Sequence, residues 1–281
     1  MLATAIIVFR EVLEAALIIG IVLAATQGLA RRGVWVSAGI MTGVAGAGLV
    51  AWFADAISPA LAGAGQEVFN AGIMFFAVVM LGWHNVWMKR HGREMAQHMR
   101  DMGQAVKLGS RSMLMLAMVI GLAVLREGSE VVLFLFGIAV AQQDSFGLML
   151  SGGLLGLLSG AMMGLLMYRG LVHISSRYLF TVTTWMITLL AAGMAAQAAG
   201  FLEQADLLPP LVQSLWDSSG IVAQNSILGR VLQTLIGYAD HPSGIQVLFY
   251  TVTLVGIAVF MRLYGSAPSS KKVQPVNAIE T

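Results

Sequence analysis

Residues 1–26 read MLATAIIVFREVLEAALIIGIVLAAT, an apolar stretch of membrane-spanning length with three ionisable side chains near its centre. These are Arg10, Glu11 and Glu14, and because no basic residues precede the stretch, it lacks the pattern of a cleaved signal peptide. Arg10 and Glu14 are four residues apart, so they share a helix face and can pair. Glu11 and Glu14 are three apart, so a helix aims both carboxylates in nearly the same direction. We therefore expect a retained first membrane span with a charged centre.

The same pattern recurs in residues 113–141, MLMLAMVIGLAVLREGSEVVLFLFGIAVA, where the ionisable residues are Arg126, Glu127 and Glu130. Each central charge costs about 2.5 to 3.5 kcal/mol on membrane-insertion scales, so these groups need compensation. The carboxylates of the two motifs outnumber the guanidinium groups, and a polyvalent cation would balance the excess. A purely structural lattice of ion pairs would more naturally be neutral. Ionisable residues inside a membrane usually mark a transport pathway, so we favour a cation site.

The composition of the whole chain agrees with a membrane protein. Of its 281 residues, 58% are hydrophobic and only 11% are charged, and the mean hydropathy is +0.81. Soluble domains carry about 25% charged residues, so soluble enzymes and nucleic-acid-binding proteins are excluded, and disorder needs far fewer apolar residues. The chain has no cysteine, which excludes disulfides, zinc-thiolate sites and iron–sulfur clusters. Any metal site must use oxygen, nitrogen or thioether ligands.

Seven stretches are long and apolar enough to cross a membrane as helices. They lie near residues 2–26, 34–57, 68–88, 113–141, 146–168, 178–200 and 245–264. The predicted fold is thus an all-α integral membrane protein with seven transmembrane helices. Because the charged motif recurs after three spans, an odd number, we expect spans 1–3 and 4–6 to form an inverted repeat, with a seventh helix added. Four glycines in the fifth span clear one face for close helix packing: Gly152, Gly156, Gly160 and Gly164.

The basic residues predict the orientation of these spans. All Lys and Arg residues except Arg10, Arg126 and Arg230 fall in the loops after spans one, three and five or in the C-terminal tail. The positive-inside rule therefore places the N-terminus outside and the C-terminus in the cytoplasm. The outer segment 201–244 contains an amphipathic pattern, Leu228, Val231, Leu232, Leu235 and Ile236, which predicts a surface helix. Residues 1–265 are expected to form one domain, followed by a disordered cytoplasmic tail at 266–281.

Two residues of the third span are further candidates. Glu67, at its outer start, is either a third-helix ligand or an ordinary interfacial acid at the mouth. His84 lies deep enough to reach a metal, but the sequence favours a hydrogen-bonded core histidine, or an inner-interface residue beside Trp83 and Trp87, over a metal ligand.

Arg-Glu-x-x-Glu in the first and fourth of seven spans, with the N-terminus outside, resembles the oxidase-dependent iron transporter family. This family comprises the fungal high-affinity iron permeases and bacterial EfeU or FtrC-type permeases. Residues 66–69 and 83–89 also look like bacterial members, and the resemblance covers nearly the whole chain. The sequence departs from the family between the motif glutamates, where it has Val-Leu and Gly-Ser instead of Gly-Leu. It also has Asn70 where relatives often carry an acid.

The resemblance implies a high-affinity permease that moves iron across the plasma membrane, here the bacterial inner membrane, with iron as substrate and no permanent cofactor. The implied metal ligands are the motif glutamates and the third-span acid: Glu11, Glu14, Glu127, Glu130 and Glu67. Arg10 and Arg126 would orient these glutamates and balance their charge. His84 and Asn70 are additional candidates because of their positions in the third span. It also implies membrane lipid around the chain and an external ferroxidase, cupredoxin-like or iron-binding partner.

Two alternatives remain open from the sequence. The first is a permease for another divalent ion such as manganese or lead. The second is a membrane-embedded carboxylate di-iron enzyme, although such sites usually use Glu-x-x-His pairs and both motifs here end in Glu. The resemblance favours a transporter over an enzyme.

Overall fold

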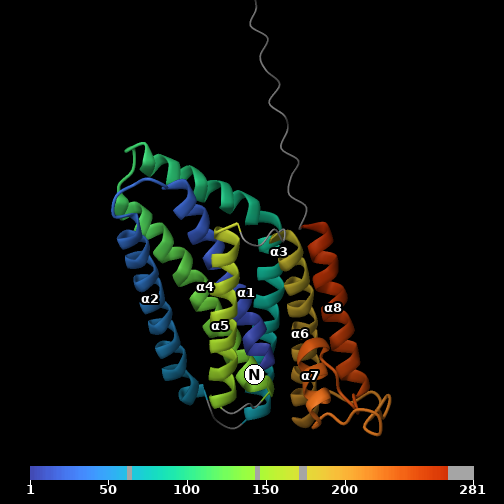
Figure 1. Ribbon diagram of the computed structural model, residues 1–281. Coiled ribbons are helices and arrows are strands. Elements are labelled where there is room, and N and C mark those ends of the chain that lie inside the picture. Colours follow the sequence, from blue (N-terminus) through green and yellow to red (C-terminus); the bar gives the residue numbers. More distant parts are fainter. Residues whose placement is uncertain (62–64, 143–145, 171–175, 265–281) are drawn as a thin grey trace, which may run out of the picture.

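The chain is all-helical over the residues that the computed structural model describes, which are 1–61, 65–142, 146–170 and 176–264 (Figure 1). The helices in this part of the chain are α1 (Leu2–Ala25), α2 (Arg32–Leu61), α3 (Gln66–Lys107), α4 (Met113–Gln142), α5 (Phe146–Tyr168), α6 (Ser176–Gln204), α7 (Ile227–Ile236) and α8 (Gly244–Leu263). The predicted tail at 266–281 lies outside the described residues. The seven long helices pack side by side as a bundle, and each overlaps one of the predicted spans.

Five of these helices contain segments long and apolar enough to cross a membrane, counting only the described residues. These segments are Arg32–Phe53, Gln66–Gly92, Phe146–Tyr168, Tyr178–Gln204 and Gly244–Leu263. Helices α1 and α4 are also long, with 24 and 30 residues, but each carries the charged motif at its centre. The prediction of an all-helical membrane protein is confirmed, whereas the count of seven spans stays a prediction because α1 and α4 are too charged to be assigned by composition.

Helix α3 is longer than its predicted span, because it does not end near residue 88 but continues to Lys107. Residues 89–107 contain no proline and are rich in Lys, Arg, Glu, Gln, Met and Ala, which favour helix. Figure 1 shows this part of α3 turning to lie across one end of the bundle. Met99 and Val106 bury one face of it against Val22 of α1 and Leu116 of α4. We call residues 93–107 the α3 arm.

Glycine faces bring two helix pairs into close contact. A Cβ atom at Gly156 of α5 would lie 2.6 Å from the carbonyl oxygen of Ala5 in α1. On the other side of the bundle, a Cβ atom at Gly43 of α2 would lie 2.6 Å from the Cβ atom of Val124 in α4. The small residues let the backbones approach closely, as predicted for the fifth span. Each first helix of the predicted repeat, α1 or α4, thus packs against the second helix of the other half.

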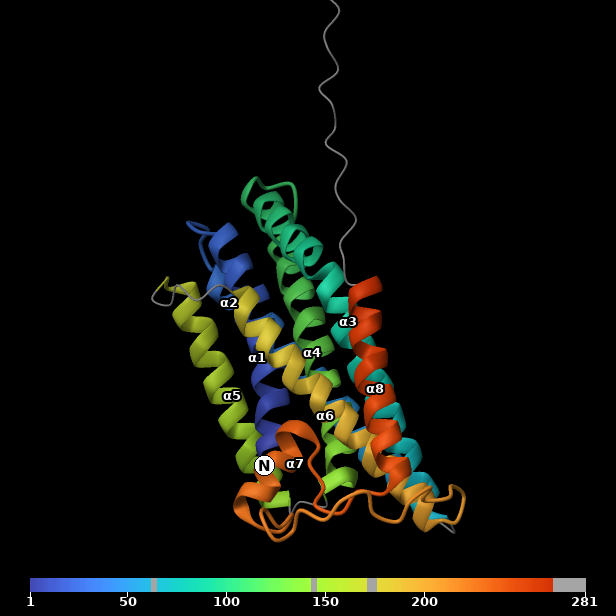
Figure 2. The same ribbon diagram turned by 90° about the vertical axis from the view of Figure 1, so that its right-hand side faces the viewer.

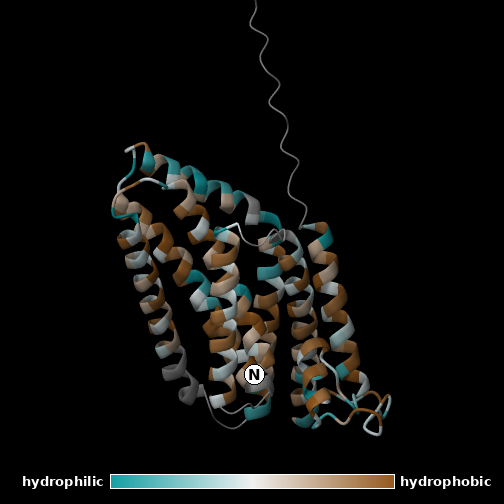
Figure 3. Cartoon of the chain, viewed as in Figure 1, coloured by the Kyte–Doolittle hydropathy of each residue, from teal (hydrophilic) through white to brown (hydrophobic). Residues whose placement is uncertain are grey.

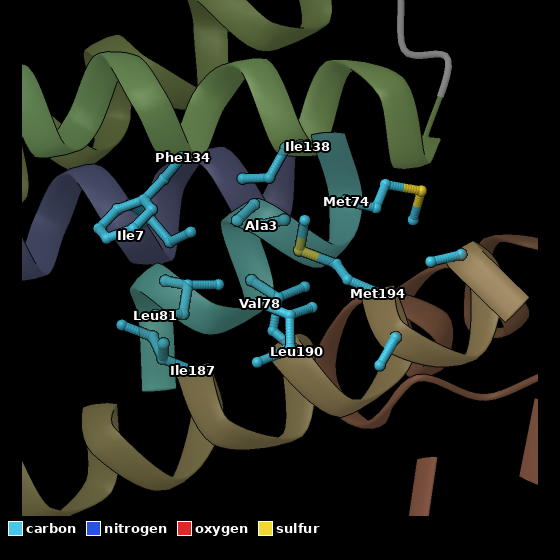
Figure 4. Close-up of a cluster of buried hydrophobic side chains, with 14 of the residues drawn as sticks. Ala3, Ile7, Met74, Val78, Leu81, Phe134, Ile138, Ile187, Leu190 and Met194 are labelled. Atoms are coloured by element: carbon cyan, nitrogen blue, oxygen red, sulfur yellow. The ribbon is translucent and has the colours of Figure 1, made fainter. Parts of the chain in front are cut away.

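Apolar side chains fill the bundle on both sides of the charged motifs. The larger cluster, shown in Figure 4, includes Ala3 and Ile7 of α1, Met74 of α3 and Ile138 of α4. In α1 these residues precede the motif, so the cluster lies toward the end of the bundle that holds the N-terminus. The smaller cluster, around Val22, fills the opposite end beneath the α3 arm. The motifs therefore lie at intermediate depth between two packed apolar regions.

Hydrophilic residues gather at the two ends of the bundle, with apolar helices between them (Figure 3). The α3 arm and the end of α8 lie at one end, and the N-terminus and α7 lie at the other, as Figures 1 and 2 both show. Helix α7 covers the segment in which the sequence predicted an amphipathic helix. Ser226 caps its N-terminus by accepting a hydrogen bond from the Gly229 amide, and Gly237 ends it in a left-handed conformation.

Candidate metal-binding site

The first motif is held rigidly inside the bundle. Arg10 Nε donates a hydrogen bond to Glu14 Oε1 at 3.0 Å, which is the pair that helix geometry predicted. Arg10 Nη1 donates to Asn85 Oδ1 of α3 at 2.9 Å, and Asn85 Nδ2 donates to Thr188 Oγ1 of α6 at 3.2 Å. The guanidinium also lies 3.9 Å from Glu11. This chain of bonds ties α1, α3 and α6 together and compensates the buried charge of Arg10.

The second motif makes the equivalent internal pair but has different neighbours. Arg126 Nε donates to Glu130 Oε1 at 3.1 Å and lies 3.9 Å from Glu127. Its guanidinium lies over the ring of Trp87 in α3, 4.1 Å from the ring centroid, a cation–π geometry. The Arg126 side chain is 33% exposed and that of Glu130 is 15% exposed, so the surroundings of this motif are more open.

His84 of α3 lies between the two motifs. Its Nδ1 contacts Glu130 Oε2, and its Nε2 lies 3.8 Å from both Glu11 Oε2 and Glu14 Oε1. Phe134 of α4 meets the imidazole edge to face, with centroids 6.2 Å apart and an interplanar angle of 87°. The structure thus places His84 at the centre of the charged cluster, not at the inner interface.

Two overlapping groups of ligand atoms result. Glu11, Glu14 and His84 offer atoms that all lie within 4.8 Å of one another, and so do Glu11, Glu127 and Glu130. Glu11 belongs to both groups. We call these five residues the central cluster.

Several atoms of the central cluster are buried without a hydrogen-bond partner among the described residues. Both carboxylate oxygens of Glu11 are in this state, as are Glu14 Oε2, Glu127 Oε2, Glu130 Oε2 and His84 Nε2. Burial of an unpaired carboxylate oxygen is costly, and a bound cation removes that cost. The donor set of carboxylate oxygens and one imidazole nitrogen fits a first-row transition metal. The central cluster can therefore hold a metal ion.

Two predicted candidates do not reach the central cluster. Glu67 is exposed in the first turn of α3, and Asn70 is half-buried one turn later. Because a helix rises about 1.5 Å per residue, Asn70 is about 21 Å from His84 along α3, and Glu67 is farther still. The structure therefore does not support Glu67 or Asn70 as direct ligands alongside the motif glutamates.

Two residues that contact the motif arginines were missed from the sequence, namely Asn85 and Trp87. Both follow His84 on α3 within the span segment Gln66–Gly92. Asn85 is a polar residue in an apolar span, a signal that could have marked it. Trp87 resembles an ordinary interfacial aromatic residue, and only its place over Arg126 shows another role.

The geometry described above joins two charged helices around a buried group of metal ligands. Residues 1–273 match the Iron permease FTR1 family. The chain belongs to this family. The FTR1 match confirms the predicted function, iron transport across a membrane, and the prediction that the protein is a transporter and not an enzyme.

The curated relatives of this FTR1 family member agree with that assignment. The chain is 29% identical to Ferrous iron permease EfeU of Escherichia coli strain CFT073 over 256 residues, which cover 89% of this chain and 91% of the relative. It is 29% identical to Ferrous iron permease EfeU of Shigella sonnei over 264 residues, 92% and 94% of the two chains. The protein of the same name from Shigella flexneri is 30% identical over 199 residues. No solved structure shows significant similarity to the chain.

Proposed function

We propose that this permease carries iron through the central cluster, with Glu11, Glu14, Glu127 and Glu130 as the carboxylate ligands. The observation that carries the proposal is Glu11, which is buried with both oxygens unpartnered and belongs to both ligand groups. Arg10 and Arg126 orient Glu14 and Glu130 and reduce the charge that the ion must balance. The cargo is ferrous iron, since the relatives are named ferrous iron permeases and the donor set suits a divalent transition metal.

All seven long helices span the membrane in this proposal. Helices α1 and α4 are tolerated at the centre of the bundle because their charges face one another and not lipid. Helices α1–α3 and α4–α6 form an inverted repeat, which is supported by the exchange of partners between α1 with α5 and α2 with α4. Binding sites in inverted repeats lie near the midplane between the halves, and the central cluster includes residues of α1 and α4, the first helices of the two proposed halves.

The proposed orientation puts the N-terminus outside and the C-terminal end of α8 in the bacterial cytoplasm. The basic α3 arm lies at the same end as the end of α8, which agrees with the positive-inside rule. The segment 205–243, including α7, then lies on the outer face. It is a surface on which a periplasmic ferroxidase, cupredoxin-like or iron-binding partner would dock to deliver iron.

Uptake of radioactive iron into proteoliposomes tests the proposal. Glu14→Gln and Glu130→Gln should each lower uptake at least about tenfold, because they remove charged ligands of a buried ion. Glu67→Gln is the matched control, since Glu67 is an exposed glutamate away from the central cluster and its loss should leave uptake unchanged. Normal uptake by both cluster variants would contradict the proposed site. Competition by excess manganese or lead in the same vesicles distinguishes an iron permease from one with broader selectivity.

A further inference from the structure

The two nitrogens of His84 have different surroundings. Nδ1 contacts Glu130 Oε2, and a neutral imidazole that carries its hydrogen on Nδ1 has its lone pair on Nε2. Nε2 is buried, has no hydrogen-bond partner among the described residues, and faces Glu11 and Glu14. A carboxylate on one imidazole nitrogen with a free lone pair on the other is the arrangement that orients histidine toward a metal.

The distances from His84 Nε2 to the carboxylates of Glu11 and Glu14 also fit shared coordination of a metal ion better than hydrogen bonding. Nε2 lies 3.8 Å from Glu11 Oε2 and 3.8 Å from Glu14 Oε1. This is too long for hydrogen bonds, which end near 3.2 Å. Two ligands that each lie about 2.1 Å from one ion are about 3 to 4 Å apart. The gap between the imidazole and the two carboxylates is therefore of the size that one small cation bridges.

One oxygen of Glu130 accepts a hydrogen bond, whereas neither oxygen of Glu11 has a hydrogen-bond partner among the described residues. Glu130 Oε1 accepts a hydrogen bond from Arg126, and Oε2 contacts His84. Phe134 packs against the imidazole edge to face and restricts its rotation. In this conformation Glu130 therefore contacts His84 in addition to belonging to the second ligand group, whereas Glu11 belongs to both groups and can coordinate an ion with either oxygen. The two motifs contribute different chemistry despite their common sequence.

We propose that His84 Nε2 is a direct ligand of the transported ion together with Glu11 and Glu14, and that Glu130 is the positioning residue for this imidazole. The inference rests on the proposed function and adds the basis of its selectivity. Imidazole nitrogen favours first-row transition metals, whereas Mg²⁺ and Ca²⁺ prefer sites made only of oxygen. His84 therefore makes the site reject these abundant ions.

Pulsed electron paramagnetic resonance of Mn²⁺ bound to the purified full chain tests the nitrogen ligand. The wild type should show one strongly coupled nitrogen, whose frequencies change when the protein is made with ¹⁵N-histidine. His84→Gln should lose this coupling, and His98→Ala should keep it, since His98 is an exposed histidine on the same helix. Bound Mn²⁺ with no nitrogen coupling, or coupling that persists in His84→Gln, would overturn the inference while leaving glutamate-dependent uptake intact. If the wild type bound no Mn²⁺ and uptake did not depend on the glutamates, the proposed function itself would fail.

A second measurement separates a ligand from a packing residue. In iron uptake, Ca²⁺ and Mg²⁺ should compete at least about tenfold better in His84→Gln than in the wild type. Glu130→Gln should keep the nitrogen coupling, because its amide oxygen can still accept from Nδ1, while Mn²⁺ affinity falls about 10- to 100-fold. Unchanged competition in His84→Gln, in a variant that still folds and binds Mn²⁺, would show that His84 does not set selectivity.

Discussion

Arg10 and Arg126 hold the same place in their motifs, yet the Arg10 side chain is 2% exposed and that of Arg126 is 33% exposed. Arg10 is fixed by Asn85 through a hydrogen bond, whereas Arg126 stacks on Trp87. The first motif is thus locked in the bundle, and the second borders a more open region. An intramembrane arginine with this exposure faces a water-filled space more readily than lipid. The difference shows that a repeat in sequence does not impose equal roles.

The largest expected difference concerns the arginines themselves. Arg10→Met leaves buried carboxylates without their hydrogen-bonded partner and should lower the free energy of unfolding by about 3 to 5 kcal/mol. Arg126→Met should cost about 1 kcal/mol or less, because water screens a partly exposed pair. Unfolding of the purified variants in mixed detergent micelles measures both values. Equal losses would show that the two motifs are equally enclosed.

Substitution of the residue that contacts Arg10 should likewise cost more stability than substitution of the residue that contacts Arg126. Asn85→Leu removes the acceptor of Arg10 Nη1 and should cost about 1 to 3 kcal/mol, since it leaves a buried charged donor unpaired. Trp87→Phe keeps an aromatic ring beneath Arg126 and should cost about 0.5 kcal/mol in cation–π energy. In a double-mutant cycle, Asn85→Leu should cost less in the Arg10→Met background. Additive losses would mean that this hydrogen bond contributes nothing.

Thiol labelling can test whether the second motif borders water. The chain has no cysteine, so a single introduced cysteine is the only target. Leu13 and Ser129 occupy equivalent motif positions, and Leu13 is fully buried whereas Ser129 is half-buried. A charged thiol reagent should modify Ser129→Cys at least about tenfold faster than Leu13→Cys, because only an accessible thiolate reacts. Equal protection of both thiols would indicate that the exposed side of the second motif faces lipid.

The smallest expected effect is a change in the local stability of the outer segment around His241. Like His84, His241 lies between carboxylates, but it is exposed to water whereas His84 is buried in the bundle. His241 contacts Asp240 at 3.1 Å and Asp217 at 3.0 Å. Its hydrogen bond with Asp240 and the charge of Asp217 raise the pKa of His241. Hydrogen bonds from Ser219 lower the pKa of Asp217, and one from the Gln224 amide lowers that of Asp240.

The signs of these shifts set a pH window. The aspartates stabilise the outer segment above about pH 3.9, and this contribution is lost as pH falls through their lowered pKa values. His241 stabilises it below about pH 6.5, and this contribution is lost as pH rises through its raised pKa. Hydrogen exchange at the Gln224 and Ser219 amides, corrected for intrinsic rates, should be slowest between these limits. His241→Gln should remove the rise in exchange above the window, and an unchanged profile would contradict the assignment.

Local helix geometry explains why much of the architecture was predictable. The hydrophobic lengths located the long helices, and the four-residue spacing gave the Arg10–Glu14 and Arg126–Glu130 pairs without any tertiary information. The α3 arm was not predicted, because its helix is stabilised by Met99 and Val106 packing against other helices. Its residue types favour helix, but the sequence does not show which helices it would pack against, so the predicted span ended near residue 88.

The site was only partly predictable for a similar reason. The motif glutamates were identified because a charge in an apolar span is conspicuous, whereas the sequence favoured a core or interfacial role for His84. Asn85 is marked only as a polar residue in an apolar span, and Trp87 has no local signal that distinguishes a partner of arginine from an ordinary interfacial residue. Their roles depend on which helices α3 touches.

The amino-acid sequence by itself determined the membrane class, the charged motifs and the excess of carboxylates over arginines, because these follow from composition and from spacing along one helix. Only the tertiary structure decided that His84 joins the two motifs, that Glu67 and Asn70 lie outside the cluster, and that the motifs differ in exposure. The physical reason is that coordination and burial depend on atoms from separate helices. Packing of the helices, and not their local sequence, sets the distances between those atoms.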